Sequence, residues 1–277
     1  MKICDLHTHS NCSDGTMTPQ ELVRLAEQRG VAALALTDHN TSKGLPAFMA
    51  AAADSSVEAV AGCEFSTEHK GKELHILGLF MPPESFQEIE DYVELMHIAK
   101  HASNLKMLKR LQQAGYRITY EEVAASTNAD EFNRSHVADL LVAKEYFANK
   151  KAAFSTVLKE GNGFYVPPKR LGSLMTIRFI KANGGVAVHA HPLYSVDYDY
   201  MLDFLPEAKA AGLDGIETLY TEYTPEQTMQ AQSLAEQFDL KPSGGSDFHG
   251  AAKPGIDIAT GRGNLQVPYE YYLNLKL

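Results

Sequence analysis

Two histidines and two acids stand close together near the start of the chain. The segment DLHTHSNCSDG, residues 5–15, places His7 and His9 two positions apart, with Asp5 before them and Asp14 after them. Imidazole and carboxylate groups are the ligands that Zn²⁺, Mn²⁺ and Fe²⁺ take in proteins. A buried strand gains nothing from two imidazoles unless each polar ring finds a partner. The spacing therefore predicts a metal site, provided that other segments supply further ligands.

The same residue types recur in five later segments: TDHN at 37–40, GCEFS at 62–66, ELHILG at 73–78, VHAHP at 188–192 and GGSDFH at 244–249. Together with the first segment they supply nine candidate metal ligands, namely His7, His9, Asp14, His39, Glu64, His75, His191, Asp247 and His249. One ion does not need so many ligands. We therefore expect two or three divalent ions (Mn, Zn or Fe), with Glu64 and Asp247 as bridging carboxylates.

Short apolar runs carry these segments and are typical of strands. The expected strands are residues 2–7, 32–37, 58–64, 73–80, 185–190, 215–219 and 241–245. Most of them are apolar on both faces, which favours a parallel sheet covered by helices. In parallel α/β barrels, catalytic groups collect at the carboxyl ends of the strands. The pattern predicts an α/β body that gathers the ligands at one end.

Helical patterns alternate with the strands, and one stretch interrupts the alternation. Thr18 and Thr224 each precede a proline and begin a capping-box pattern, which predicts a helix start. Between residues 84 and 165 the chain is mostly helical, with expected helices at 85–115, 120–126, 135–149 and 151–160. We predict a barrel body formed by residues 1–83 and 166–277, with a helical insertion at 84–165.

The composition limits the classes of partner. The chain has 277 residues, an apolar fraction of 44% and a net charge of −10. This charge argues against sequence-independent binding of long nucleic acid, which needs a basic surface. A short anionic substrate stays open, since bound cations reverse the local charge. No signal-peptide pattern and no membrane-spanning apolar run is seen, so we expect a cytoplasmic protein without membrane contact.

Taken together, the motifs DLHTHSNCSDG, ALTDHNT, AGCEFS, HILGL, GGVAVHAHP and SGGSDFH resemble the PHP (polymerase and histidinol phosphatase) superfamily. The resemblance spans residues 5–249 and implies a distorted (β/α)7 barrel with a trinuclear metal site. By this resemblance, one ion would be held by His7, His9, Glu64 and Asp247, a second by Glu64, His75 and His191, and a third by Asp14, His39 and His249. Asp5 and Asp38 would orient the histidines.

Two segments narrow the resemblance to one branch. NRSHVADLLV at 133–142 and GFYVPPKRLGS at 163–173 resemble nucleotide 3′,5′-bisphosphatases that also trim short RNA from its 5′ end. In that branch the insertion covers the active-site cleft, which makes Arg134, His136 and Lys169 the candidate substrate-binding residues. The alternative is that they are ordinary charges at the start of a surface helix.

The chain also departs from that branch. Leu193 and Tyr194 stand where the branch often has Gly-Arg, so an arginine that could bind phosphate is missing. His189 occupies a usually apolar position, and either faces the metals or replaces a core side chain. The role of Glu217 also stays open. His69, His97 and His101 are assigned no role.

The expected reaction is hydrolysis of a phosphomonoester in a small phosphorylated metabolite. The first choice is a nucleotide 3′,5′-bisphosphate, which would lose its 3′-phosphate to a metal-activated water. Asp247, His191 and His249 are the catalytic candidates, and either histidine could serve as a weak acid toward the leaving oxygen. The alternatives are a 5′–3′ exonuclease or phosphodiesterase acting on short RNA, a histidinol-phosphate-type phosphatase, an amidohydrolase, and a non-catalytic metal-binding module. An amidohydrolase usually needs a carboxylated lysine, and no strand ends in lysine.

Overall fold

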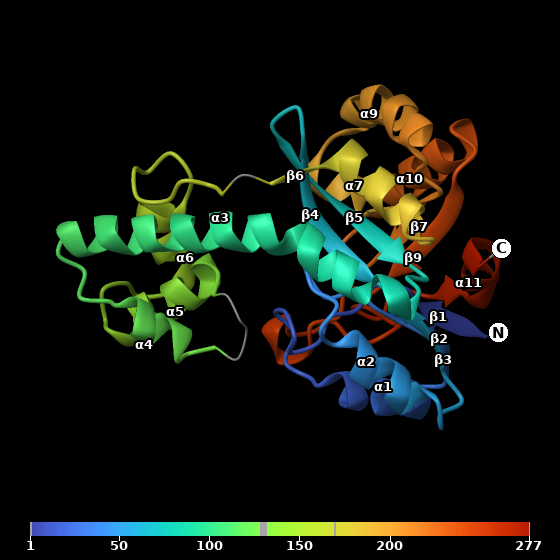
Figure 1. Ribbon diagram of the computed structural model, residues 1–277, viewed down its shortest axis with the longest axis horizontal. Helices are drawn as coiled ribbons and strands as arrows, with labels where there is room; N and C mark the ends of the chain where they lie inside the picture. The colour runs from blue at the N-terminus through green and yellow to red at the C-terminus, as the bar shows by residue number, and fades with distance from the viewer. Residues whose placement is uncertain (1, 128–131, 169, 277) are drawn as a thin grey trace. The chain divides into compact units, whose positions relative to one another are not determined.

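The computed structural model describes residues 2–127, 132–168 and 170–276 (Figure 1). The chain divides into two compact units, Met1–Asp91 with Leu171–Leu277, and Tyr92–Arg170. We call the first unit the α/β body and the second the helical insertion. The role of the insertion as a cover for the cleft stays a prediction.

Two sheets form the centre of the body. The smaller has the order β10-β1-β2-β3, and the larger has the order β6-β4-β5-β7-β8-β9. The strands are β1 (Ile3–Asp5), β2 (Val31–Leu36), β3 (Glu58–Ala61), β4 (Cys63–His69), β5 (Lys72–Leu79), β6 (Leu171–Gly172), β7 (Val186–Ala190), β8 (Gly215–Tyr220), β9 (Lys241–Gly245) and β10 (Val267–Pro268). Strands β1, β2 and β3 pair in parallel, as do β7, β8 and β9. The predicted α/β class is therefore confirmed.

Strand β5 departs from the expected parallel arrangement, because it pairs antiparallel with both β4 and β7. Only Lys70 and Gly71 separate β4 from β5, and both have positive φ values, of 49° and 77°. A two-residue turn with this backbone joins antiparallel strands, whereas a parallel pair needs a long crossover. The local turn thus decides the direction of the strand that carries His75.

Backbone hydrogen bonds connect the two sheets at both of their junctions. On one side, the Leu6 N–H donates to the Gly244 carbonyl over 3.1 Å, which ties β1 to β9. On the other side, the Glu64 N–H of β4 donates to the Asp38 carbonyl, just after β2, over 3.1 Å. The carboxyl ends of β1, β2, β7 and β9 therefore meet, and most of the candidate ligands follow these ends. Glu64 lies instead at the start of β4, because the expected strand 58–64 is divided at Gly62, and His75 lies within β5.

Helices cover the outer faces of both sheets (Figure 1). The helices of the body are α1 (Pro19–Gln28), α2 (Leu45–Ala52), α7 (Ser173–Ala182), α8 (Pro192–Ser195), α9 (Tyr198–Ala211), α10 (Pro225–Gln237) and α11 (Tyr269–Lys276). Both predicted capping boxes are present, at Thr18 and at Thr224. Leu22 of α1 and Phe48 of α2 are fully buried in one apolar cluster with Leu34 of β2. This packing holds β2 in place, and with it the loop that carries Asp38 and His39.

The insertion has an apolar core of its own. Helix α3 (Phe86–Gln113) begins in the body and continues into the insertion, which also contains α4 (Tyr120–Ala124), α5 (Arg134–Ala143), α6 (Lys150–Ala153) and a π-helical turn at Phe154–Leu158. Leu111, Val137 and Leu141 are fully buried in this core. The predicted helix 135–149 ends early, at Ala143, because Glu145 takes a positive φ of 60° that no α-helix contains.

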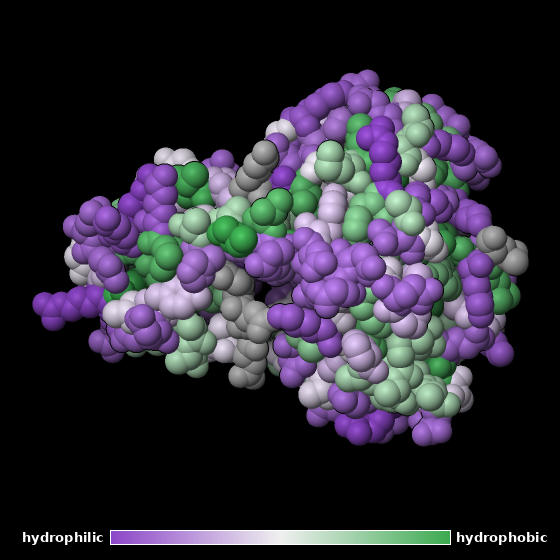
Figure 2. Space-filling model, viewed as in Figure 1, coloured by the Kyte–Doolittle hydropathy of each residue, from purple (hydrophilic) through white to green (hydrophobic). Residues whose placement is uncertain are grey.

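Figure 2 shows hydrophilic side chains spread over the visible face of the body, with apolar residues in small groups between them. Such a mixture is ordinary for a protein surface in contact with water. In the part of the chain that the structure describes, no helix combines the length and the apolar character needed to cross a membrane.

Candidate metal centre

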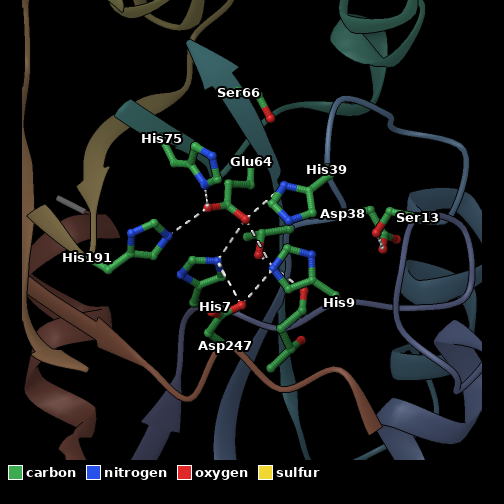
Figure 3. Close-up of polar contacts among 12 residues, drawn as sticks. His7, His9, Ser13, Asp38, His39, Glu64, Ser66, His75, His191 and Asp247 are labelled. Atoms are coloured by element: carbon green, nitrogen blue, oxygen red, sulfur yellow. Dashed lines mark hydrogen bonds and ion pairs between the residues drawn. The ribbon is translucent and has the colours of Figure 1, made fainter. Parts of the chain in front are cut away.

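The fold brings the predicted metal ligands from distant parts of the sequence to one place (Figure 3). They lie on or directly after strands of both sheets. Strand β1 leads to His7, His9 and Asp14, β2 to His39, β4 carries Glu64, β5 carries His75, β7 leads to His191, and β9 leads to Asp247 and His249. The ligands that follow β1, β2, β7 and β9 lie at carboxyl ends of strands, as the sequence predicts, whereas Glu64 lies at the start of β4 and His75 within the antiparallel strand β5.

The carboxylate of Glu64 lies at the centre of this group. Its Oε1 is 2.7 Å from His75 Nδ1 and 3.1 Å from His191 Nε2. Its Oε2 is 3.1 Å from a nitrogen of each of three other imidazoles, those of His7, His9 and His39. Each oxygen thus faces a separate set of histidines, and this carboxylate would suit a position shared between two cations.

Asp247 divides its oxygens in a different way. Its Oδ1 lies 3.2 Å from His9 Nε2 and 3.8 Å from His7 Nε2. Its Oδ2 accepts hydrogen bonds from the Tyr220 hydroxyl at 2.9 Å and the Lys253 ammonium at 2.6 Å. One oxygen is therefore aimed at the ligand cluster, and the other is fixed by two donors.

A third group of ligands surrounds Asp14. The carboxylate Oδ1 is 3.1 Å from His249 Nε2, and Oδ2 is 3.9 Å from His39 Nε2. His9, Asp14, His39 and His249 each offer one ligand atom, and these atoms lie within 4.8 Å of one another. The same spacing holds within two further sets, His7, His9 and Glu64, and His39, Glu64 and His75. In this structure His9 and His39 each belong to two sets, whereas the family resemblance assigns each of them to a single ion.

The hydrogen bonding of the imidazoles fits bound cations. Among the residues that the structure describes, five buried ring nitrogens have no hydrogen-bond partner. One is Nδ1 of His189, and the other four belong to predicted ligands: Nδ1 and Nε2 of His9, Nδ1 of His39 and Nε2 of His249. An unpaired buried polar atom is costly, and three of these nitrogens nevertheless face carboxylate oxygens at 3.1 or 3.2 Å. Divalent cations with nitrogen and oxygen ligands would satisfy these atoms, so the donor set fits Zn²⁺, Mn²⁺ or Fe²⁺.

The charges of the cluster shift the pKa values of its members in opposite directions. Burial raises the pKa of the Glu64 carboxyl, but the imidazoles of His39 and His7 outweigh it, so the pKa lies well below the usual 4.5. Burial lowers the pKa of His75, yet the negative charge of Glu64 outweighs this effect and raises it to about 10. Glu64 is therefore ionised at neutral pH, the form that binds a cation.

Asp5 and Asp38 hold the backbone of the ligand loops. Asp5, fully buried, accepts hydrogen bonds from the Ser246 N–H at 2.9 Å and from the Ala259 N–H at 2.7 Å. Asp38 accepts from the N–H of Ser10 at 2.8 Å and from its hydroxyl at 2.6 Å. Each acid thus fixes a residue next to a ligand, and its hydrogen bonds run to backbone and serine groups rather than to the imidazoles that it was expected to orient.

Glu217, whose role the sequence leaves open, touches two ligand residues directly. Its Oε1 lies 3.0 Å from His7 Nδ1, and its Oε2 accepts the His191 N–H over 2.7 Å. His191 has a left-handed backbone with φ of 31°, which a non-glycine residue adopts only where its surroundings enforce it. Glu217 therefore orients one imidazole and stabilises the strained backbone of another ligand.

Lys253 and Tyr220 are neighbours of the site that the sequence motifs do not reveal. Lys253 lies six residues after Asp247, beyond the end of the SGGSDFH motif, and its position follows from a 3-10 turn at Gly250–Ala252. Tyr220 ends β8 in the run GIETLY, which resembles an ordinary core strand. A lone lysine or tyrosine near a motif is too common to single out, so no sequence signal distinguishes them.

Two of the predicted substrate residues, Arg134 and His136, lie in the insertion. The Arg134 guanidinium lies 4.1 Å from the ring centroid of Tyr165 and donates to the Leu158 carbonyl over 3.2 Å. The His136 Nδ1 accepts the Asn133 N–H over 3.2 Å in a capping box. Both side chains therefore have contacts within the insertion, and their role toward a substrate stays a prediction. Lys169 lies outside the described residues.

His189 does not join the cluster of ligands. Its ring contacts Phe204 of α9 at 5.3 Å between centroids, and burial, followed by the charges of His191 and His75, lowers its pKa to about 3. It is therefore a neutral core residue. The left-handed backbone of His191 separates two side chains that would share one face of a continuous strand.

The ligand cluster opens into a cleft of the body. The cleft has a volume of about 730 Å³ and is lined by His39, Glu64, His75, His191 and Asp247. Lys253 and the ion pair of Arg262 with Glu222 also line it. A small phosphorylated molecule therefore has room to reach the ligand residues.

Comparison with known proteins identifies relatives along most of the chain. A 5′-3′ exoribonuclease of Haemophilus influenzae is 32% identical, over 88% of this chain and 89% of that protein. A 3′,5′-nucleoside bisphosphate phosphatase of Chromobacterium violaceum is 29% identical, over 92% of this chain and 90% of that protein. The crystal structure of a proposed metal-dependent phosphoesterase from Bifidobacterium adolescentis superposes with a TM-score of 0.84 and 28% identity, covering 99% of this chain and 95% of that one.

The family model of the PHP domain matches residues 5–172, more than half of the chain. This match includes the ligand segments of β1, β2, β4 and β5, and the relatives extend the similarity to most of the remainder. With the ligand cluster at the strand ends, these matches confirm the resemblance seen in the sequence, and the chain belongs to the PHP domain family.

Proposed function

We propose that this protein is a metal-dependent phosphoesterase that hydrolyses phosphomonoesters of nucleotides, with a nucleoside 3′,5′-bisphosphate as the first substrate to test. The observation that carries this proposal is the position of the Glu64 carboxylate, whose two oxygens face separate sets of imidazoles. The similarity to the 3′,5′-nucleoside bisphosphate phosphatase supports the choice of substrate.

The nine clustered ligands would hold two or three divalent ions, with Glu64 shared between them. When bound, such ions would supply a water of lowered pKa as the nucleophile and would neutralise charge on the phosphoryl oxygens. The residues of the chain supply the positioning. Glu217 orients His7, and Tyr220 with Lys253 fixes one oxygen of Asp247.

Lys253 has a second role in this proposal. Its side chain is 38% exposed and lines the cleft, while its ammonium stays 2.6 Å from Asp247 Oδ2. An ammonium group carries three donors, so Lys253 can bind a substrate phosphate oxygen without releasing Asp247. His191 and His249 stay the candidates for donating a proton to the leaving oxygen.

The second candidate function is hydrolysis of short RNA from its 5′ end. The exoribonuclease relative favours it, as does a second cleft that shares the lining residues Tyr194 and Ser195 with the metal cleft. A metal centre that supports hydrolysis of a phosphomonoester can also support hydrolysis of a phosphodiester, provided that the cleft has room for the leaving nucleoside.

The test uses purified protein loaded with Mn²⁺. We expect release of p-nitrophenol from p-nitrophenyl phosphate faster than from the bis ester, and release of the 3′-phosphate from adenosine 3′,5′-bisphosphate. Chromatography of the products identifies which phosphate leaves. Full metal content without hydrolysis of any of these esters would contradict the proposed function.

A further inference from the structure

A second cleft adjoins the metal cleft in the α/β body. It has a volume of about 650 Å³, compared with about 730 Å³ for the metal cleft. Tyr194 and Ser195 line both clefts, so these residues form a shared wall. Tyr198, Tyr200 and Gln230 are among the other residues that line the second cleft. The second cleft therefore combines aromatic rings with uncharged polar groups.

Tyr194 on this wall is exposed but held in position. Its side chain is 61% exposed, which is unusual for so large a ring. The preceding residue, Leu193, is fixed from both sides, since its N–H donates to the Tyr223 hydroxyl at 3.0 Å and its carbonyl accepts from Gln227 Nε2 at 2.8 Å. The ring meets Tyr220 edge to face, at 5.8 Å between centroids. A ligand that stacks on such a ring needs little reordering of the protein.

The metal centre determines what can reach this ring. The Tyr194 ring lies 6.0 Å, between centroids, from the ring of His191, one of the clustered ligands. A phosphoryl group bound at the cluster would therefore have its attached groups within reach of the tyrosine. Any nucleobase can stack on an exposed tyrosine ring, because every base has a π-face.

The charges of the second cleft favour a nucleoside over another phosphate group. Lys72 is positive, but Asp197 and Asp199 on the same walls are negative, and Asp197 is also the cap of α9, accepting the Tyr200 N–H at 2.8 Å. A phosphate would meet more negative than positive charge there. An uncharged base and ribose would meet an aromatic ring and the amides of two glutamines.

We infer that the second cleft is a subsite for a second nucleoside, and that Tyr194 stacks with its base. This inference rests on the proposed function and favours its second candidate, in which the substrates are dinucleotides and short RNA whose scissile phosphate lies at the metal cluster. Tyr194 then determines specificity for substrates that carry a second base.

The variants that test the subsite are Tyr194→Ala and Tyr194→Phe. The control is Met229→Ala on α10, where the side chain is 63% exposed and lines neither cleft. Stacking of a base on an aromatic side chain accounts for about tenfold or more in affinity. We expect Tyr194→Ala to raise the Kd of a non-hydrolysable dinucleotide 5′-phosphate about tenfold, measured by calorimetry, while Tyr194→Phe and Met229→Ala stay within about twofold of the wild type.

Kinetics give a second readout. Ribose 5-phosphate carries no base, so its kcat/KM should fall about tenfold less in Tyr194→Ala than the kcat/KM of the dinucleotide does. An equal loss on both substrates, or an unchanged Kd for the dinucleotide, would overturn the subsite. If the wild type binds the dinucleotide but hydrolyses no phosphoester, the proposed function is wrong, and the Kd of Tyr194→Ala still decides the subsite.

Discussion

At the scale of single residues, the site depends on carboxylates that make two different contacts with their two oxygens. Glu64 divides five imidazoles between its oxygens, and Asp247 faces the cluster with one oxygen and two donors with the other. Glu217 connects His7 to the backbone of His191. Substitution of each acid by its amide removes the negative charge and keeps the size of the side chain. It therefore tests the contribution of the charge at these three positions.

Asp247→Asn removes the charge and keeps the size of the side chain. Substitution of a residue that only orients a metal ligand lowers activity or metal affinity about 10- to 100-fold. Asp247 is itself a predicted ligand, so its substitution should lower kcat by at least about 100-fold. Metal content, measured by plasma mass spectrometry after dialysis, should decrease in parallel. The control is Asp257→Asn, because Asp257 forms an exposed ion pair with Arg29 and its own side chain is 40% exposed. If Asp247→Asn kept near wild-type turnover and full metal content, the assignment of Asp247 as a metal ligand would be wrong.

Glu217→Gln tests a residue that acts through other residues. The amide nitrogen of glutamine cannot accept a hydrogen bond, so either the His7 ring or the His191 N–H loses its partner. We expect the affinity for Mn²⁺ to decrease about 10- to 100-fold, with the circular dichroism spectrum of the fold preserved. Glu222→Gln is the matched control, because Glu222 pairs with Arg262 and not with an imidazole. Equal affinities of the two variants would show that Glu217 is only a structural residue.

At the scale of elements, close approach of strands brings the ligands together. Asp247 follows β9, and its N–H donates to the carbonyl of His7 over 2.9 Å. Gly245 makes this approach possible, since a Cβ there would lie 2.4 Å from the Cβ of His7. Two segments more than 230 positions apart in the sequence thus meet through a position that has no room for a side chain.

Gly245→Ala should push β9 away from β1. Overpacking of this kind costs about 1–3 kcal/mol in the free energy of unfolding, and we expect a weaker metal affinity because His7 and Asp247 are displaced. Urea unfolding and metal titration measure the two effects. Gly172→Ala is the control, because its added Cβ would meet nothing closer than 4.0 Å and its φ is −75°. If both alanine variants unfold at the same urea concentration, the close approach of the strands does not matter for stability.

At the scale of the whole molecule, bound cations should contribute to stability. The cluster joins β1, β2, β4, β5, β7 and β9, so a cation held there connects both sheets. A ligand present at about 100 times its Kd adds about 2.7 kcal/mol to the free energy of unfolding. Removal of metal should therefore affect the body as a unit and not only its activity.

The corresponding measurement is thermal unfolding before and after treatment with a chelator. We expect chelation to lower the Tm and abolish hydrolysis, and added Mn²⁺ to restore both. The Asp247→Asn variant should bind the cation more weakly than the wild type. Chelation and added Mn²⁺ should therefore each change its Tm by less. A Tm that does not depend on metal in the wild type would contradict the prediction that the ions join the two sheets.

The sequence by itself determined the types of ligand, their order along the chain and the family. Each depends on local information, such as the residues of DLHTHSNCSDG, the apolar runs that precede the ligands and the capping boxes at Thr18 and Thr224. It also predicted the α/β class, because alternation of strands and helices is a local pattern.

The tertiary structure alone decided which groups meet. The antiparallel pairing of β5, the sharing of His9 and His39 between ligand sets, and the arrival of Lys253 and Tyr220 at Asp247 depend on strand register and on turns between distant segments. His189 and His191 show the same division, since they are two positions apart, yet a left-handed backbone at His191 sends one ring to the core and the other to the cluster. Contacts between residues far apart in the chain are set by packing of the whole fold, and no local pattern of residue types contains them.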